Sequence, residues 1–182
     1  MDNIKIYSKQ NRIEKSLFDE FFALMEQSFP TSERRDYEGF FAEFEHPCFH
    51  SICYQPERLA GVLNYYDFED FIYIEHFAVS PELRGQGTGA ALIGEIKRIG
   101  EGKKLVLEAE PPSDGDIACR RIGFYERLGF SLNEYAYIQP PLIKGEQPIP
   151  LVIMSFPERL SEKEYLDIRS VLYREVYSGW NG

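Results

Sequence analysis

The stretch that most constrains this chain is Phe71–Gly100, FIYIEHFAVSPELRGQGTGAALIGEIKRIG. It begins with an apolar run typical of a buried strand and ends with apolar residues at helical spacing. Between them lies Arg84-Gly-Gln-Gly-Thr-Gly89, directly before the predicted helix. Glycine allows a positive φ and a close ligand approach, and the first N–H groups of a helix are unpaired and partly positive. The stretch predicts a pyrophosphate-binding turn over Arg84–Ala90. The alternative is a turn that only connects strand to helix.

The same pattern reading predicts the other elements. Strands are expected at residues 4–7, 49–55, 59–67, 71–79, 104–110, 131–139 and 149–156, and helices at 16–28, 33–45, 87–99, 116–128 and 161–177. The short loops between residues 49 and 79 favour antiparallel hairpins, whereas the strand at 104–110 follows a helix and should lie parallel to the strand at 71–79. The expected fold is one mixed α/β domain over residues 1–182, with a mostly antiparallel sheet and helices on both faces.

Two finer expectations concern local geometry. Ser16 with Asp19, and Ser161 with Glu164, have the spacing of a helix capping box. Strict alternation along the strand at 71–79 places Phe77 and Val79 on the face of Phe71 and Tyr73. It also points the side chains of Glu75 and His76 to opposite faces of the sheet.

Composition narrows the class of function. The chain has 182 residues, 43% of them hydrophobic, and a net charge of −10, which opposes nucleic-acid binding. No apolar run is long enough for a bilayer, and no secretory signal is evident, so a cytoplasmic protein without membrane contact is expected. The three cysteines lack metal-site spacing, which favours reduced thiols and no metal. The negative charge suits a cationic substrate such as an amine, although solubility alone explains it.

Two motifs together suggest a family. Arg84-Gly-Gln-Gly87-Thr-Gly89 matches the loop Arg/Gln-x-x-Gly-x-Gly/Ala, and Gly123-Phe-Tyr125-Glu-Arg-Leu-Gly129-Phe130 contains Phe-Tyr-x-x-x-Gly-Phe. With a helix and a strand between them, they make the chain resemble the GNAT superfamily of N-acetyltransferases. The resemblance implies that a parallel strand pair, the fourth and fifth strands, splays apart to admit acetyl-CoA. It also implies acetyl transfer to a primary amine of a small molecule or peptide, by direct attack in a ternary complex.

The resemblance also implies roles for cofactor-binding residues. Those expected to contact the pantetheine arm of coenzyme A are Phe77, Ala78 and Val79, with a backbone N–H near Ala78 at the thioester oxygen. Those expected to hold the pyrophosphate, mostly through main-chain N–H groups, are Arg84, Gly85, Gln86, Gly87, Thr88, Gly89 and Ala90.

The reaction needs an acid for the departing thiolate and a route for the amine proton. Tyr125 matches the family's tyrosine and is predicted to be the acid, although a core tyrosine is the alternative. Glu75 is predicted to be the base, because burial raises a carboxyl pKa. Glu108, Glu110 and no protein base at all are the competing possibilities. Many family members carry asparagine where this chain has Ala118, which leaves the acceptor side less defined.

Two other functions fit parts of the sequence. Gly85, Gly87 and Ala90 also satisfy G-x-G-x-x-A, with Glu108 further on, as in a Rossmann oxidoreductase. However, an antiparallel meander precedes the loop and no alternating parallel units follow it. A non-catalytic acyl-CoA sensor would share the loop. The acceptor pocket is expected between residues 16–45 and 139–150, and the apolar stripe of the C-terminal helix allows packing on its own sheet or a homodimer.

Overall fold

A computed structural model describes residues 3–143 and 145–177, and the chain divides into two compact units, Met1–Leu105 and Val106–Gly182. The single domain over residues 1–182 stays a prediction, and its residues 1–2, 144 and 178–182 lie outside the described part. Within the described ranges, no helix combines the length and apolar character needed to cross a membrane.

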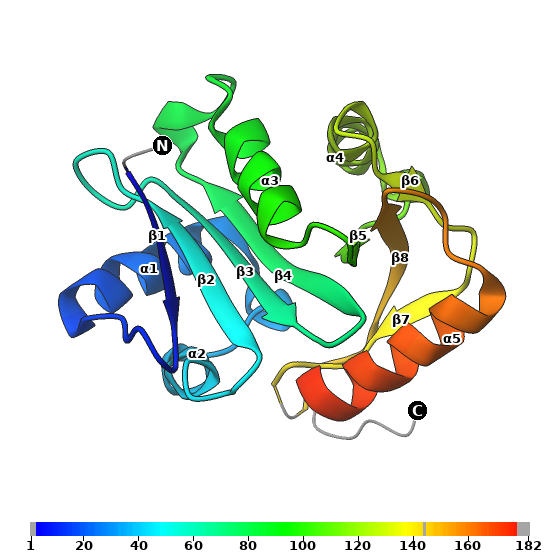
Figure 1. Ribbon diagram of the computed structural model, residues 1–182, viewed down its shortest axis with the longest axis horizontal. Coiled ribbons are helices and arrows are strands. Elements are labelled where there is room, and N and C mark those ends of the chain that lie inside the picture. Colours follow the sequence, from blue (N-terminus) through cyan, green and yellow to red (C-terminus); the bar gives the residue numbers. More distant parts are fainter. Residues whose placement is uncertain (1–2, 144, 178–182) are drawn as a thin grey trace. The chain divides into compact units, whose positions relative to one another are not determined.

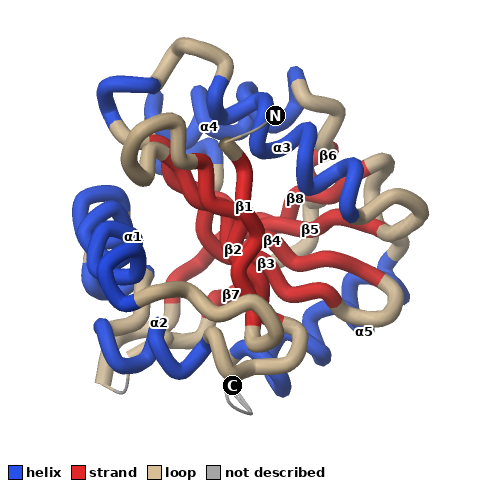
Figure 2. Tube along the Cα trace, turned by 60° about the vertical axis from the view of Figure 1, so that its left-hand side comes forward, coloured by secondary structure: helices blue, strands red, loops and turns tan. Residues whose placement is uncertain are grey.

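The first unit is a layered α/β structure. Its elements are β1 (Ile4–Ser8), α1 (Lys15–Ser28), α2 (Tyr37–Glu43), β2 (Phe49–Tyr54), β3 (Gly61–Asp67), β4 (Phe71–Val79) and α3 (Thr88–Ile99). The four strands pair antiparallel in chain order, which confirms the predicted hairpins. Helices α1 and α2 cover one face of this sheet and α3 covers the other (Figures 1 and 2). Strand β5 (Lys104–Ala109) then leads into the second unit.

An aromatic core fills the space between α1, α2 and the sheet. Phe18 and Phe21 are fully buried on α1, and both rings meet Phe44 edge-to-face at centroid distances of 5.9 and 5.6 Å. Phe44 in turn contacts Phe49 on β2 at 5.1 Å, and Phe49 contacts the ring of Tyr66 on β3 at 5.3 Å. Such pairs add to the large apolar area that each ring buries, so this face of the sheet is firmly packed.

A β-bulge interrupts β4 at Glu75. The register pairs Tyr65 with Ile74 but Asn64 with His76, so Glu75 is an extra residue on β4. Two consecutive side chains therefore point toward α1 and α2: Glu75 pairs with Arg35, and His76 contacts Phe29 and Phe40. The prediction that Glu75 and His76 lie on opposite faces is wrong, because a bulge shifts the alternation by one residue.

The bulge also moves the residues that follow it. Phe77 pairs with Leu63, and Val79 pairs with Gly61, whose position faces Leu92 of α3. Phe77 and Val79 therefore lie on the α3 face, opposite to Tyr73, and not on its face as strict alternation predicted.

Helix starts differ from the predicted capping near the N-terminus. Helix α1 begins at Lys15 after Glu14, with no side-chain cap, so Ser16 lies inside the first turn and does not cap it. The second predicted helix begins late: a 3-10 turn at Thr31–Glu33 precedes α2, and the Asp36 side chain accepts from the N–H of Gly39. This cap fixes the start of α2 at Tyr37.

The second unit combines short strands with two helices. Its further elements are α4 (Asp116–Arg127), β6 (Ser131–Leu132), β7 (Tyr137–Gln139), β8 (Ile149–Phe156) and α5 (Glu162–Val171), followed by a π-helical turn at Leu172–Val176. The strand order is β5-β8-β6, and β7 also pairs with β8 (Figure 1). The capping box of Ser161 and Glu164 is confirmed at the start of α5.

The single strand predicted at 131–139 is wrong, because the chain leaves the ladder after Leu132. The buried amide of Asn133 donates to the Ile153 carbonyl and Ser155 Oγ and accepts from the N–H of Leu160. These bonds tie the link between β6 and β7 to β8 and to the start of α5. The Asn133 side chain thus satisfies the buried N–H of Leu160, which lies outside the strands.

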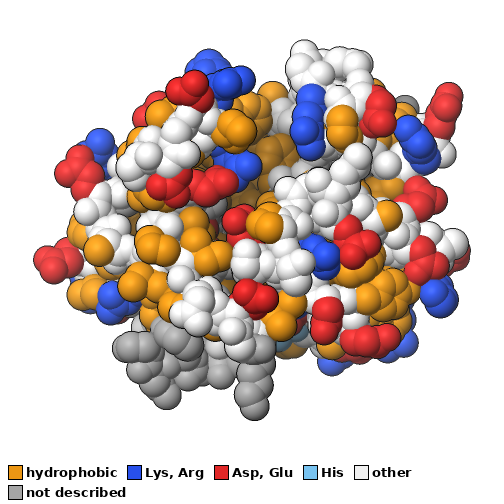
Figure 3. All heavy atoms as spheres, turned by 180° about the vertical axis from the view of Figure 1, so that it is seen from behind, with side chains coloured by type: hydrophobic (Ala, Val, Ile, Leu, Met, Phe, Trp, Pro, Cys, Tyr) orange, Lys and Arg blue, Asp and Glu red, His pale blue; other side chains and the backbone are white. Residues whose placement is uncertain are grey.

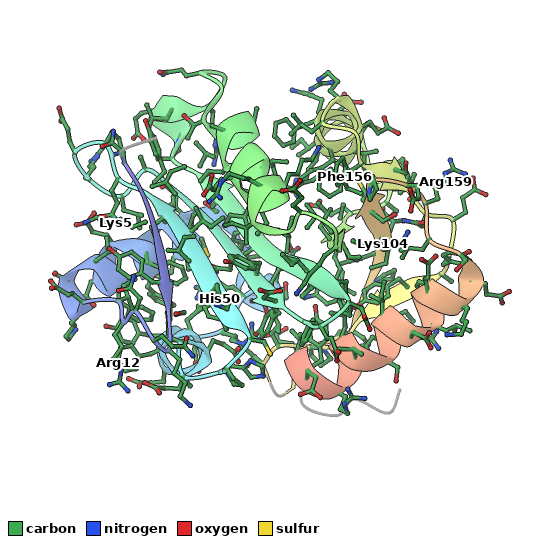
Figure 4. The ribbon with its side chains drawn as sticks, viewed as in Figure 1. Lys5, Arg12, His50, Lys104, Phe156 and Arg159 are labelled. Atoms are coloured by element: carbon green, nitrogen blue, oxygen red, sulfur yellow. The ribbon has the colours of Figure 1, made fainter. Side chains whose placement is uncertain are left out.

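Charged side chains of both signs are interspersed with apolar ones over the face in Figure 3. Both arginines labelled in Figure 4 make exposed ion pairs, Arg12 with Glu45 at 3.0 Å and Arg159 with Glu134 at 3.6 Å. Exposed pairs of this kind contribute roughly 0–1 kcal/mol. The stability of each unit therefore depends mainly on its buried core.

Candidate active site

The loop after β4 has the geometry of an anion-binding turn. Gly85 and Gly87 have φ angles of 76° and 84°, and Gly87 is the N-cap residue of α3 without a side-chain cap. A Cβ added at either glycine would meet nothing within 4 Å. Glycine is therefore favoured here by its positive φ and not by crowding. The loop is exposed, so the first N–H groups of α3 begin at an open surface.

Side chains of the loop hold its shape from outside. Arg84 Nε donates to the carbonyl of Val79 at 3.1 Å, and Gln86 Nε2 donates to the carbonyl of Glu82 at 2.7 Å. The 3-10 turn at Pro81–Leu83, which contains Glu82, lies between Val79 and Arg84. These two bonds tie the loop back to the end of β4 and to the 3-10 turn, and the main-chain N–H groups of Thr88–Ala90 follow at the start of α3. Such N–H groups and the helix dipole favour phosphate.

The end of β4 leads directly into this loop. Phe77 and Val79 are half-buried and Ala78 is 4% exposed. At the bulge, Glu75 as a whole is half-buried although its side chain is only 2% exposed. The accessible surface of Glu75 therefore belongs to its main chain. β-Bulges are over-represented next to active sites, where they redirect a side chain or end the strand pairing.

The carboxylate of Glu75 is buried and paired. Arg35 Nη1 forms an ion pair with Oε1, and His76 Nδ1 lies 3.1 Å from Oε2. Burial alone would raise the pKa of Glu75. The positive charge of Arg35 and the smaller effect of His76 together lower this pKa to about 2. The expectation of a raised pKa for Glu75 is therefore wrong, because Arg35, 40 residues earlier in the chain, pairs with this carboxylate.

Tyr125 lies on α4 in the second unit and is 6% exposed. Its ring contacts Phe124 and Phe130 at centroid distances of 5.3 and 5.8 Å. Burial raises the pKa of Tyr125 to about 12; the charge of Arg121 lowers it and that of Glu110 raises it further. The phenol therefore stays protonated at neutral pH and can donate a proton or a hydrogen bond.

The other two carboxylates considered as bases are engaged in the second unit. Glu108 accepts hydrogen bonds from the hydroxyls of Tyr137 and Tyr177, the latter at 2.9 and 3.0 Å. Glu110 forms an ion pair with Arg121. Both carboxylates have structural partners of their own.

The structure brings together side chains that sequence reasoning missed. Arg35, Glu43 and Tyr66 surround Glu75 in the first unit: Arg35 Nη2 donates to Tyr66 Oη at 3.2 Å, Arg35 Nε lies 3.2 Å from Glu43, and Tyr66 donates to Glu43. The only sequence signal was the pair Arg34-Arg35 before a helix, which does not say which arginine is buried. In the described residues, no group of three or more His, Cys, Asp or Glu side chains could hold a metal ion.

Comparisons with known proteins agree with the motif reading. Residues 13–130 match the model of the acetyltransferase (GNAT) family. A solved "Putative acetyltransferase from GNAT family" from Bacteroides thetaiotaomicron superposes with a TM-score of 0.86 at 31% identity, covering 98% of this chain and 99% of its own. "Putative acetyltransferase YjbC" of Bacillus subtilis is 28% identical over 129 residues, which are 70% of this chain and 66% of that relative, just under two thirds of its length.

More distant structures share the fold. An aminoglycoside 6'-N-acetyltransferase complexed with coenzyme A superposes with a TM-score of 0.62 at 13% identity, covering 87% of this chain and 99% of that one. The Arabidopsis thaliana protein NAA60, in complex with acetyl-CoA, gives 0.63 at 17% identity, covering 84% and 97%. The predicted mixed α/β fold of the GNAT type is confirmed.

Proposed function

Because this chain belongs to the acetyltransferase (GNAT) family, we propose that it transfers an acetyl group from acetyl-CoA to a primary amine. The observation that carries the proposal is the turn between β4 and α3. Its two glycines of positive φ and its helix start without a side-chain cap lie inside the matched region. In this proposal the N–H groups of residues 87–90 bind the pyrophosphate, and Phe77–Val79 contact the pantetheine arm.

The proposed reaction is a direct attack. The amine nitrogen forms a bond to the thioester carbonyl carbon, and the carbon–sulfur bond breaks. The phenol of Tyr125 gives its proton to the departing sulfur and regains one from solvent. A pKa raised to about 12 keeps that proton on Tyr125 until the thiolate forms. The products are an acetamide and free coenzyme A.

The amine must also lose a proton. An alkylamine of pKa about 10.4 is protonated at neutral pH, so its free base costs about 4–5 kcal/mol. Glu75 was predicted to accept this proton, and that role stays a hypothesis. Its pairing with Arg35 and its pKa of about 2 make it a weak base. We therefore favour loss of the amine proton to water.

The acceptor class is proposed more broadly than the cofactor. Structures that share the fold include the aminoglycoside enzyme and Arabidopsis thaliana Naa50 with the bisubstrate analogue CoA-Ac-MVNAL, so the fold serves small molecules and peptides alike. The net charge of −10 favours a cationic acceptor. A non-catalytic acyl-CoA sensor would share the loop, but it would not need a proton donor such as Tyr125.

The test combines binding and turnover. Isothermal titration with acetyl-CoA and with NAD measures cofactor choice, and thiol release is followed with a panel of amines and peptide N-termini. We expect acetyl-CoA binding, amine-dependent thiol release, and a fall in kcat of about 10²-fold or more in Tyr125→Phe. Because Cys119 is exposed, a blank without amine is subtracted. Binding of NAD but not of acetyl-CoA would falsify the proposal, and tight acetyl-CoA binding without turnover would favour the sensor.

A further inference from the structure

The segment Glu33–Glu43 is joined to β3 and β4 by three polar links. Arg35 pairs with Glu75, His76 Nε2 lies 3.0 Å from the carbonyl of Glu33, and Tyr66 donates to Glu43. The side chains of Arg35, Glu75 and His76 are 8%, 2% and 2% exposed. These links lie in an otherwise aromatic layer, where an unpaired charge is costly, so they fix the segment against the strands.

Arg35 connects two of these links, the pair with Glu75 and the bond between Tyr66 and Glu43. Its guanidinium reaches the carboxylates of Glu75 and Glu43 and the hydroxyl of Tyr66 with three different nitrogens. The residues it contacts come from α2, β3 and β4. A planar guanidinium can hold several acceptors in a fixed geometry, which the single ammonium of lysine cannot reproduce.

The carboxylate that Arg35 holds belongs to the one extra residue of β4. At a bulge the ladder is locally interrupted, so the backbone there is less constrained by sheet hydrogen bonds. The accessible part of Glu75 is its main chain, and Phe77–Val79 follow along the strand after His76. The Glu75 side chain is thus held by Arg35 on the face of the sheet covered by α1 and α2, whereas the main chain of Glu75 is accessible.

We propose that Arg35 is a positioning residue, which holds the Glu75 side chain and thereby fixes the bulged main chain of β4 that leads into the proposed pantetheine contacts at Phe77–Val79. The inference rests on the proposed acetyl transfer. In this view Glu75 carries no proton during the reaction.

The base and anchor roles of Glu75 predict opposite results. If Glu75 is a base, Glu75→Gln loses about 10²–10⁴-fold in kcat. Arg35→Met would then free the carboxylate and make it a stronger base, with activity kept or increased. If Glu75 is an anchor, Gln still accepts a hydrogen bond from Arg35 and activity stays within about fivefold. Arg35→Met would then lower kcat/KM for acetyl-CoA by about tenfold to 10²-fold, since small misplacements are costly.

The experiment compares Glu75→Gln, Arg35→Met and Arg35→Lys with Arg34→Met as the matched control. Arg34 is the neighbouring arginine and is also partly buried, but its guanidinium pairs with Glu26 and lies over the ring of Phe22. We expect Arg34→Met to destabilise the protein without changing the kinetics of acetyl-CoA use. A severe loss in Glu75→Gln together with an active Arg35→Met would overturn the proposal.

A second readout needs no activity. Backbone amide shifts and hydrogen exchange of residues 74–79 should change in Arg35→Met and not in Arg34→Met. Arg35→Lys, which keeps the charge but not the fork, replaces Arg35→Met if the latter does not fold. Unchanged bulge amides in the Arg35 variant would refute the anchor. A wild-type protein that fails to bind acetyl-CoA refutes the proposed function instead, and the amide data still decide the role of Arg35.

Discussion

Replacing Gly87 by alanine tests the cofactor loop at a residue whose backbone conformation favours glycine. Gly87 has a φ of 84° and begins α3, and an added Cβ would meet nothing within 4 Å. The substitution therefore introduces backbone strain without a steric clash. A left-handed conformation costs a non-glycine residue about 1–2 kcal/mol.

The strain can lower either the free energy of unfolding or the affinity for acetyl-CoA, and both quantities are measurable. If the loop keeps its shape, the free energy of unfolding falls by about 1–2 kcal/mol. If the loop relaxes to a negative φ, the N–H groups of residues 87–90 turn away and the same free energy appears as weaker acetyl-CoA binding. One factor of ten corresponds to about 1.4 kcal/mol, so Kd would rise about 5–30-fold. Thermal unfolding and isothermal titration with acetyl-CoA measure the two effects.

Two variants make the test specific. Gly94→Ala removes a glycine from the exposed middle of α3, where a Cβ also meets nothing within 4 Å, and should stabilise the helix by about 1 kcal/mol without changing Kd. Gly87→Asn should recover part of the loss, because asparagine tolerates the left-handed conformation. Wild-type stability and wild-type acetyl-CoA affinity in Gly87→Ala would refute the loop argument.

Three further predictions concern stability. The pKa of Glu75 is lowered from 4.5 to about 2 in the folded protein, so its contribution to the free energy of unfolding is complete above about pH 4.5 and is lost as the pH falls toward 2. Over that range the free energy of unfolding should fall less in Glu75→Gln than in the wild type. Equal pH dependence in the two proteins would contradict the pairing. Ser161→Ala removes the capping box of α5 and should lower the free energy of unfolding by about 1 kcal/mol, seen as a Tm lower by about 2–4 °C. An unchanged Tm would show that the cap is dispensable. Asn133→Ala leaves the buried N–H of Leu160 without its acceptor and should lower the free energy of unfolding in urea by about 1–3 kcal/mol. An unchanged free energy of unfolding would mean that water replaces the amide.

Much of the fold was predictable because local signals and hydrophobic period agree. The strand Phe71–Val79 and the strand Ile149–Phe156 have the predicted bounds, and α3 begins one residue after the expected Gly87. The errors arose where one side chain decides the backbone path. Asn133 ends β6 through bonds to residues far along the sequence, and Asp36 rather than an earlier residue starts α2.

The candidate site divides in the same way. The glycine loop could be predicted, because positive φ and a helix start depend on neighbouring residues. The environment of Glu75 could not, because its pKa depends on Arg35, a long-range partner with no periodic signal. The bulge was missed for a related reason: it is an irregularity in pairing between β3 and β4, and the apolar residues around it hide the break in alternation.

The extra residue in β4 acts on side-chain direction as a frameshift acts on a reading frame. If β4 kept all its residues but paired one to one with β3 without the bulge, regular alternation would return and every side chain from His76 to Val79 would exchange faces. His76 would then leave Phe29 and Phe40 for the α3 side, and Phe77 would enter the layer of α1 and α2. A homologue with a strand of the same length but without the bulge can therefore carry the same residues at aligned positions and present them to the opposite layer. Transfer of residue roles along this strand therefore requires the position of the bulge as well as the aligned residues.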